Sequence, residues 1–563
     1  MSNYKKNVLM KKFTNKIFAA LIAPMLAVGC IEEAFPEGST QVAEQVGASE
    51  FALGGLVNSF PVAMMQVDTR DFYSKYGTHV DFGLPAIHLM TEAMLEDIAI
   101  MASNPGYWSF NYWSRNVGMN DQSWPCGYFW ENYYAYIKIA NDVISVIEVS
   151  DDMPELNKHY LGYGYAYRAM CYLDLARMYE PKENDYTDVS KVLGLTVPII
   201  TEKTTAEQIG NNPRVQRDVM YEFILSDLKM AAELLATADN NYTVPTLAAV
   251  YAMYAKAYLE MGYWKEGGDI EAFKNAAKYA RLAIETSGKT PLTEAQWHDP
   301  VNGFNKGSAN NSWIWGLPVS SDLIGNIICY TAHICCEGQW GYTTVSNPGI
   351  DKRLYEQIHA KDFRRYSFLS PDRTEWTSGK YKFAGSTVDQ QTFFGALAKP
   401  YTAIKFRPVN GNCTEYVEGN PADHCLLRVE ELYFIEMEAV AHYNLAEAKN
   451  LLNTFMGYRV LDGSYDCSEV ETDVDWFINE MFIQKRIEFW AEGVMFYDYK
   501  RLDKGITRFY EGSNHPNMWA FNTTGRSPQW NLVINRGEFQ ANIGIDETTN
   551  NPDPSGLLVV PAE

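Results

Sequence analysis

Two regions of helical periodicity, separated by more than a hundred residues without it, constrain most strongly what this chain of 563 residues can fold into. Within each region apolar side chains recur three and four positions apart, which places them on one face of an α-helix. The runs that show this spacing are 130–144, 162–179, 216–235, 246–261, 270–286, 426–443, 445–459 and 473–493. The sequence therefore predicts a mainly α-helical scaffold, interrupted by an insert of different character.

Two neighbouring runs have the spacing of a repeated helix pair. Ala255 and Tyr258 lie on the first run, the chain turns near Gly262, and Ala276 and Tyr279 lie on the second. Small residues let two helices approach closely, and aromatic rings fill the gap to the next pair, as in tetratricopeptide repeats. We expect about four such helix pairs, at about 128–287 and 426–493.

The insert, at about 288–425, is rich in loops and in aromatic residues. It contains many Gly, Asn, Pro and Ser residues, and only short runs such as 312–317 look like strands. Long loops inside a globular chain are functional or disordered, and this one is too aromatic for disorder. We expect it to be an irregular ligand-binding part within a single domain over residues 51–563.

The amino-terminal segment has the pattern of a bacterial lipoprotein signal. Lysines precede an apolar run at 17–28, which is shorter than the roughly 20 residues that span a bilayer. Leu26 stands four positions before Cys30, which ends the run. We expect residues 1–29 to be a signal peptide, Cys30 to carry lipid, and residues 30–50 to form an acidic tether. An ordinary signal peptide with an incidental cysteine is the alternative.

Charge and aromatic content narrow the classes of ligand. The net charge is -23, and removal of the five lysines of the leader brings it to about -28. A nucleic-acid partner is not expected, because such binding needs a basic face. Aromatic residues make up 14% of the chain, with 37 Tyr and 14 Trp. Flat amphipathic side chains in this number suit the recognition of sugars or peptides.

Cysteine and histidine spacings match no metal or catalytic pattern. Eight cysteines remain besides Cys30, without the spacing of a structural zinc site. Which pair among Cys329, Cys335 and Cys336 would form a disulfide stays open. The nine histidines lack the helical spacing of a metalloprotease, and phosphate-binding and serine-nucleophile motifs are absent. The sequence therefore predicts no cofactor, metal ligand or catalytic residue.

Several segments, in order, carry a resemblance to one family. They are 130–141, Arg168 to Tyr179 followed by Val197-Pro198, 221–235, 427–459 with Glu436 and Glu438, and Gln484 to Gly493 ahead of Asp498 and Arg501. Each segment alone is a common helix pattern, whereas their order together with the lipoprotein signal is specific. With these features the chain resembles the SusD/RagB-like outer-membrane lipoproteins of Bacteroidetes.

The resemblance implies a place and a role. Such proteins sit on the outer face of the outer membrane, anchored by lipid, as a lid on a SusC-like TonB-dependent transporter. They capture oligosaccharides, or sometimes peptides, and catalyse nothing. Acidic residues after the lipidated cysteine favour export to the surface in these bacteria, and Glu32-Glu33 fits this pattern. The expected function is therefore surface capture of a glycan and its delivery to the transporter, with peptide capture as the alternative.

Two groups of side chains are the candidate ligand contacts. The first resembles the place where family members put an acidic residue and a stacking tryptophan. Aromatic faces stack on the C–H faces of sugars, while carboxylates and amides bind the hydroxyls. The first group is Asp97, Tyr107, Trp108, Asn111 and Trp113, and the second, in the insert, is Trp315, Trp340 and Tyr342. Core packing is the alternative role for each aromatic residue.

Two other classes of protein are weighed against this interpretation. A secreted glycoside hydrolase would need two carboxylates across a cleft, and nothing marks a pair among acids such as Asp97, Asp121 and Glu131. A helical-repeat scaffold that binds only proteins would leave the aromatic insert without a role. Turnover of a glycan would separate the first class from a binding protein. A dependence of ligand binding on Trp108 or Trp340 would separate a ligand-capturing protein from the second class, a scaffold that binds only proteins.

Overall fold

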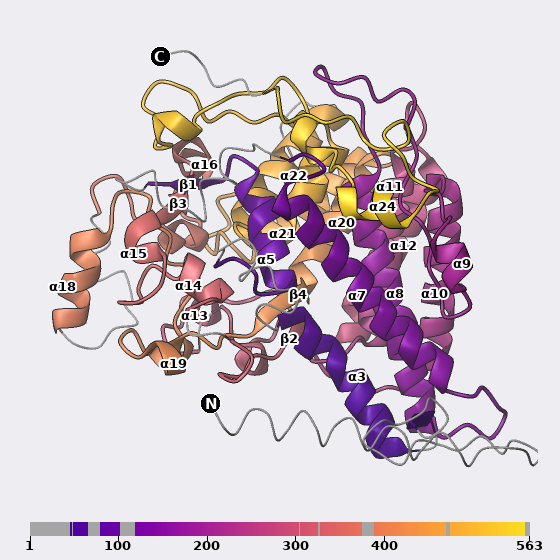
Figure 1. Ribbon diagram of the computed structural model, residues 1–563. Helices are drawn as coiled ribbons and strands as arrows, with labels where there is room; N and C mark the ends of the chain where they lie inside the picture. Colours follow the sequence, from indigo (N-terminus) through magenta and orange to yellow (C-terminus); the bar gives the residue numbers. More distant parts are fainter. Residues whose placement is uncertain are drawn as a thin grey trace, which may run out of the picture.

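Helices that follow one another along the chain pack as neighbours and form the scaffold of the computed structural model (Figure 1). The structure describes residues 46–47, 49–65, 79–101, 119–302, 304–324, 327–373, 388–468 and 473–557. The scaffold helices are α7 (Trp124–Val146), α8 (Glu155–Tyr179), α10 (Arg217–Leu234), α11 (Leu247–Gly262), α12 (Ile270–Ser287), α20 (Val429–Ala441), α21 (Leu445–Met456) and α22 (Val474–Glu488). Each predicted helical run falls on one of them, so the predicted helical-repeat scaffold is confirmed.

The predicted helix pair is seen as α11 and α12, and its boundaries have local causes. The side chain of Thr246 caps α11 by accepting a hydrogen bond from the backbone N–H of Ala249. Asp269 does the same for the first turn of α12, while Gly288, at a φ of 60°, ends it. These caps satisfy backbone groups that a helix end leaves unpaired. Buried alanines of α12 such as Ala276 let the two helices approach closely.

The insert leaves the scaffold and returns to it at almost the same place. It begins after α12 and ends at α20, and these two helices contact each other directly. Strand β2 pairs antiparallel with β4, with Trp313 opposite Arg428 and Leu317 opposite His424. The elements of this part are α13 (Glu294–Trp297), η2 (Gly307–Ala309), β2 (Trp313–Leu317), α14 (Tyr330–Ile334), α15 (Thr343–Ser346), β3 (Pro348–Ile350), α16 (Lys352–Gln357), η3 (Phe363–Ser367), α18 (Val388–Leu397), η4 (Val409–Gly411), α19 (Tyr416–Gly419) and β4 (His424–Arg428).

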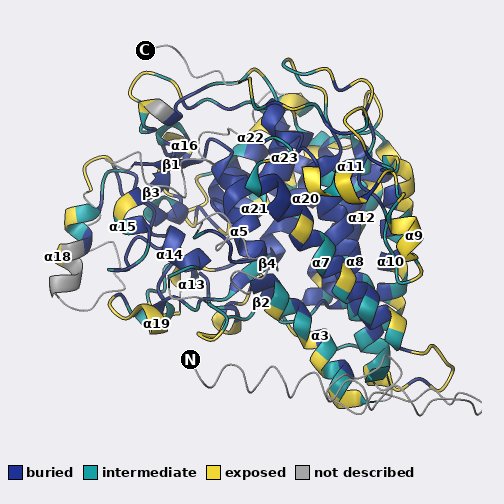
Figure 2. Cartoon of the chain, viewed as in Figure 1, coloured by how far each residue is buried: buried dark blue, intermediate teal, exposed yellow. Residues whose placement is uncertain are grey.

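Elements before, between and after the scaffold helices complete the structure. Strand β1 pairs antiparallel with β3 of the insert, with Ile98 opposite Ile350. These elements are α3 (Glu50–Met65), α5 (Leu84–Ala93), β1 (Ile98–Ile100), α9 (Ala206–Ile209), α23 (Met495–Arg501), η5 (Asn517–Trp519), η6 (Pro528–Trp530) and α24 (Arg536–Ala541). Buried residues continue from the scaffold through α5 and β4 into the insert (Figure 2). Within the described ranges, no helix combines the length and the apolar character needed to cross a membrane.

A buried network of charges joins the insert to the scaffold. The carboxylate of Glu488, at the end of α22, lies 2.9 Å from Arg364, 2.7 Å from Arg428 and 2.8 Å from Arg459. Burial alone would raise the pKa of Glu488, but the guanidinium groups of Arg459 and Arg428 hold it well below its usual value. Lys405 of the insert lies 2.5 Å from the carboxylate of Glu492. The insert is thus fixed to α22 by ion pairs that are shielded from water.

The cysteines of the described residues are all free, and all except Cys425 are buried. Cys329, Cys335 and Cys336 are among them, so this structure contains no disulfide among these three residues. The predicted signal peptide, and Cys30 with most of the tether, lie outside the described residues. Lipidation and the outer boundaries of the domain therefore stay predictions.

Candidate functional site

Trp340 and Tyr342 lie together in the insert, at the turn between α14 and α15. The hydroxyl of Tyr342 is 2.7 Å from Nδ1 of His79, and its ring centre is 4.2 Å from that of His333. Trp340 is 8% exposed and Tyr342 is 2% exposed. Their rings pack in a small cluster with Cys329, Ala332 and Cys335. The structure thus brings two predicted residues together, and their contact with ligand stays a prediction.

The segment that carries most of the first predicted group is attached close to this turn. Tyr107, Trp108, Asn111 and Trp113 lie outside the described residues. Met101, the last described residue before them, accepts a hydrogen bond from Lys399 of the insert and donates one, of 3.3 Å, to the carbonyl of Asn347. Asn347 directly follows α15. The chain therefore enters segment 102–118 beside the end of α15, five residues from Tyr342.

Asp97, the remaining residue of the first group, is held in the interior. It is fully buried, and its carboxylate lies 2.5 Å from the guanidinium of Arg486 on α22. The hydroxyl of Tyr499 donates to the same carboxylate at 3.1 Å, and Nε1 of Trp490 donates to the backbone carbonyl at 2.9 Å. These contacts tie the start of β1 to α22. They position the strand from which segment 102–118 continues.

Trp315 lies apart from Trp340 and Tyr342, on β2 against the scaffold. It is 2% exposed, and its ring meets that of Tyr167 on α8 edge to face at 5.2 Å. It also lines an interior cavity of about 60 Å³. Pockets that hold organic ligands occupy about 300 to 1,000 Å³, whereas this space has room only for a few water molecules. The surroundings of Trp315 are therefore those of a core residue.

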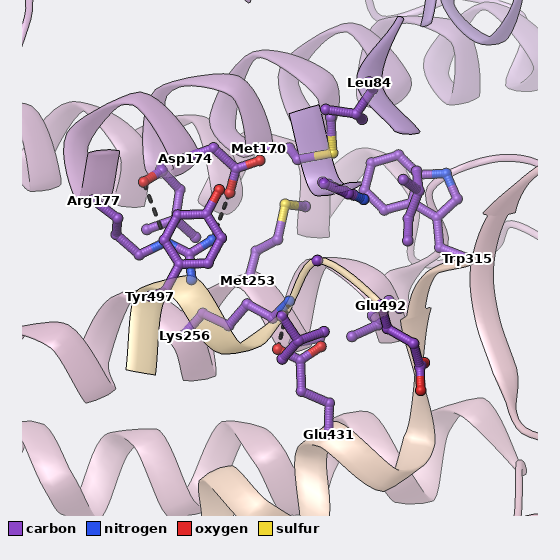
Figure 3. Close-up of a pocket in the computed structure, with 17 residues that line it drawn as sticks. Leu84, Met170, Asp174, Arg177, Met253, Lys256, Trp315, Glu431, Glu492 and Tyr497 are labelled. Carbon is purple, nitrogen blue, oxygen red and sulfur yellow. Dashed lines mark hydrogen bonds and ion pairs between the residues drawn. The ribbon is translucent and has the colours of Figure 1, made fainter. Parts of the chain in front are cut away.

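The interior cavity has a largely apolar lining with a few charged side chains, and these charges are already paired (Figure 3). Asp174 lies 2.5 Å from Arg177, whose guanidinium stands 3.6 Å above the ring of Tyr497. On the other side Lys256 lies 2.9 Å from Glu431. Charged side chains that are paired in this way need no ligand to satisfy them. Their role at this cavity is therefore structural.

Two histidines lie against each other at this cavity. Nδ1 of His88 is 2.9 Å from Nε2 of His424. Burial lowers the pKa of His88 to about 4, and burial together with His88 lowers the pKa of His424 well below its usual value. Both rings are therefore neutral at pH 7, and one ring N–H donates to the other ring.

A second, open cleft lies at the ends of scaffold helices, and its size suits a ligand. It has about 400 Å³ of accessible space, within the range of about 300 to 1,000 Å³ for ligand pockets. Arg217 at the start of α10 and Tyr263 and Trp264 just after α11 contribute to its wall. None of these residues stands out in the sequence, because the wall is assembled from separate segments of the chain. Among the described residues, the cleft included, no group of three or more His, Cys, Asp or Glu side chains is placed to hold a metal ion.

Comparisons with known proteins agree on one family. A family model described as "Starch-binding associating with outer membrane", SusD-like_3, matches residues 64–259. SusD-like protein P2 of Formosa agariphila is 24% identical over an alignment of 448 positions, which covers 75% of this chain and 78% of that protein.

Solved structures share the fold over most of the chain. The SusD-like carbohydrate-binding protein of Bacteroides vulgatus has a TM-score of 0.66 at 19% identity, covering 88% of this chain and 97% of its own. Surface glycan-binding protein A of Bacteroides thetaiotaomicron, in complex with laminarihexaose, has a TM-score of 0.60 at 17% identity, covering 89% of this chain and 99% of its own.

Proposed function

Because this chain is a SusD-like protein, we propose that it captures oligosaccharides at the surface of the outer membrane and delivers them to a SusC-like TonB-dependent transporter. The family is described as starch-binding and associated with the outer membrane. One observation carries the saccharide part of the proposal. A protein that shares this fold across 89% of the chain is known in complex with laminarihexaose.

We place the ligand beside the insert, at segment 102–118 and the turn that holds Trp340 and Tyr342. This proposal is supported by Met101, the last described residue before the segment, which is hydrogen-bonded to the insert next to α15. Trp108 and its neighbours Tyr107 and Trp113 would supply stacking faces, and Asn111 would supply an amide for hydroxyls. Trp340 and Tyr342, which are mostly buried, would support the wall of the site.

Lipid at Cys30 would hold the protein to the membrane. The leader supports this proposal, because a short apolar run ends at this cysteine. The acidic residues Glu32 and Glu33, two and three positions after it, support exposure at the outer face. A ligand that must be handed on needs moderate affinity, which stacking contacts provide without burying charges.

A binding screen with the purified full chain tests the proposal. Oligosaccharides and oligopeptides would be titrated by calorimetry against the unchanged chain and against Trp108→Ala and Trp340→Ala. Trp476→Ala, a partly buried tryptophan at the start of α22, is the matched control. We expect an oligosaccharide to bind, and Trp108→Ala to weaken binding by tenfold or more while Trp476→Ala does not.

Each contrary outcome has a definite meaning. Binding of peptides alone would replace the saccharide by a peptide ligand. Release of shorter saccharides, measured by chromatography after incubation, would show a hydrolase and overturn the proposal. Saccharide binding that is unchanged in Trp108→Ala would overturn the placement of the site but not the ligand class.

A further inference from the structure

The open cleft of the scaffold has an excess of positive charge in a chain whose net charge is -23. Its cationic lining residues are Lys182, Arg217, Arg501 and Arg526, whereas its acidic lining residues are Glu180 and Glu183. The cleft lies where α8, α11 and α23 end and α10 begins. Figure 1 shows α10 and α11 on the opposite side of the molecule from α15 and α18 of the insert. This cleft is therefore separate from the turn of Trp340 and Tyr342.

The cations of the cleft differ in how closely carboxylates pair with them. Glu180 is buried and is shared by two cations, Lys182 and Arg217, each at 3.1 Å. Arg526 has Asp503 as its ion-pair partner, at 3.4 Å, and that carboxylate is largely exposed. Arg501 alone is fully neutralised, because Glu260, Glu438 and Asp498 surround it. Glu180 is thus the carboxylate that both Lys182 and Arg217 contact, and the two cationic side chains remain partly exposed. Glu183 also lines the cleft, without an ion pair to either of them.

Lys500 is buried behind the cleft, where the end of a scaffold helix holds it. Its Nζ donates to the backbone carbonyls of Met178 at 2.6 Å and Arg177 at 3.0 Å, at the end of α8. Among the described residues no carboxylate lies within ion-pair distance of it. Burial, together with the charge of Lys182, lowers the pKa of Lys500 well below its usual value. Helix-end carbonyls therefore account for Lys500, and it is not counted among the cations that would contact a ligand.

The wall of the cleft also offers aromatic surface. The guanidinium of Arg217 stands 4.9 Å above the ring of Trp264, and Tyr263 lies next to it. The accessible space of about 400 Å³ is much larger than an inorganic anion needs. A guanidinium held against an aromatic ring, beside an ammonium group, suits the acidic substituent of a saccharide.

We propose that this cleft binds the carboxylate or sulfate group of an acidic saccharide, with Arg217 and Lys182 as its charged contacts. The negative charge of the rest of the protein does not prevent this, because salt screens charges beyond about 8 Å at physiological ionic strength. The same screening makes binding weaken as salt is added. The proposal goes beyond neutral glycan capture at the insert and does not depend on it.

Two disaccharides that differ only at one carbon provide the test. Cellobiouronic acid carries a carboxylate where cellobiose carries a hydroxymethyl group, and both would be titrated by calorimetry against the full chain. We expect the acid to bind and cellobiose to bind at least tenfold more weakly. Arg217→Ala should raise the Kd of the acid by about tenfold or more, since hydrogen bonds to charged groups are strong.

Arg281→Ala is the matched control for Arg217→Ala. Arg281 is also a half-exposed arginine, it lies 2.5 Å from Glu436, and its guanidinium stands over Tyr433. It lies outside the cleft, so its removal should leave the Kd unchanged. Trp340→Ala should likewise leave binding of the acid unchanged, which separates this site from the insert.

Three results would overturn the proposal. Equal affinity for the two disaccharides would remove the role of the carboxylate. An unchanged Kd in Arg217→Ala would place the acid elsewhere. Inorganic sulfate that binds as tightly as cellobiouronic acid would show a site for a simple oxyanion and not for a saccharide.

Discussion

Glu488 is the carboxylate that pairs with the largest number of buried arginines in the network between insert and scaffold. Its two carboxylate oxygens face Arg364, Arg428 and Arg459, and all four side chains are almost completely shielded from water. Arg364 belongs to the insert, while Arg459 follows α21. Burial of a guanidinium group without an ion-pair partner is destabilising. The carboxylate of Glu488 supplies that partner.

Replacement of this carboxylate by an amide should be strongly destabilising. In Glu488→Gln the volume is kept, but three buried arginines lose their shared charge. We expect the free energy of unfolding to fall by about 3 to 5 kcal/mol, measured by chemical denaturation followed by circular dichroism. Glu155→Gln, at an exposed ion pair with Lys158, should change it little. Equal effects in the two variants would show that the network contributes nothing beyond a surface pair.

His88 makes stability depend on pH in a defined window. Its pKa is about 4 in the folded chain and 6.5 when exposed, so between these values the unfolded chain binds more protons. Stability from this group is therefore complete above pH 6.5 and is lost as pH falls toward 4. Between pH 7 and pH 5 the loss is about 2 kcal/mol.

Urea denaturation at pH 7 and pH 5 would measure this effect. His88→Gln cannot take up the proton, so its free energy of unfolding should fall less between the two pH values than that of the unchanged chain. Other buried histidines, such as His333 and His442, are common to both proteins and cancel in the comparison. The same pH dependence in both proteins would contradict the assignment to His88.

At the scale of elements, the junction of α22 and α23 requires a glycine. Gly493 has a φ of +80°, and a Cβ there would lie 2.4 Å from the Cβ of His88. Gly463 has a similar φ, +71°, but nothing lies within 4 Å of its Cβ position. The two glycines thus share the same backbone strain and differ in the space around them.

Alanine at each position separates these two causes. Gly463→Ala should cost about 1 to 2 kcal/mol for the left-handed conformation. Gly493→Ala should cost about 1 to 3 kcal/mol more, because α5 or α23 must move to make room. Thermal unfolding of both variants gives the comparison. An equal loss of unfolding free energy in the two variants would mean that the junction accommodates the extra Cβ without strain.

Helices with one apolar face and clear ends were predictable from the sequence, and other elements were not. The periodicity at 246–261 and 270–286 coincides with caps at Thr246 and Asp269, so pattern and termini agree. Helix α3 contains Pro61 and two glycines, and helix α23 is only seven residues long, so neither shows a periodic signal. Strand β1 depends on β3, its partner 250 residues away in the chain, which no local pattern reveals.

The candidate sites were predictable only in part, for the same reason. Aromatic clusters can be read directly, and Trp340 and Tyr342 do lie together. Ion pairs such as that of Asp97 with Arg486 join residues 389 positions apart, so their partners were not visible. The basic cleft is assembled from the ends of separate helices and was missed entirely. In this chain the sequence shows the kinds of side chain, and the packing of distant segments decides their surroundings.

For the whole molecule, the buried charges predict that insert and scaffold unfold together. Lys405 of the insert donates to the carbonyl of Glu488 at 2.8 Å and contacts Glu492 at 2.5 Å. Separation of the two parts would expose these groups and break their pairing. We expect hydrogen exchange, followed by mass spectrometry at increasing urea, to show the same midpoint for peptides of the insert and of α11 and α12.

Lys405→Ala supplies the comparison for this experiment. Without the ammonium group the insert loses one attachment, so its peptides should exchange at a lower urea concentration than those of α11 and α12. If the insert of the unchanged chain already opened first, the buried charges would not couple the two parts.

The position of the insert has a consequence for descent and diversification. Because α12 and α20 contact each other, and β2 and β4 run side by side, the excursion starts and ends at fixed neighbouring points. Doubling the length of such a closed excursion costs only about 0.6 kcal/mol in chain entropy. Mutations, insertions and deletions can therefore change the length and sequence of the insert while the helical scaffold keeps its structure. Only a few features of the insert must then be inherited unchanged. They are the paired strands β2 and β4, where the insert meets the scaffold, and the cations that contact the end of α22, such as Arg364 and Lys405.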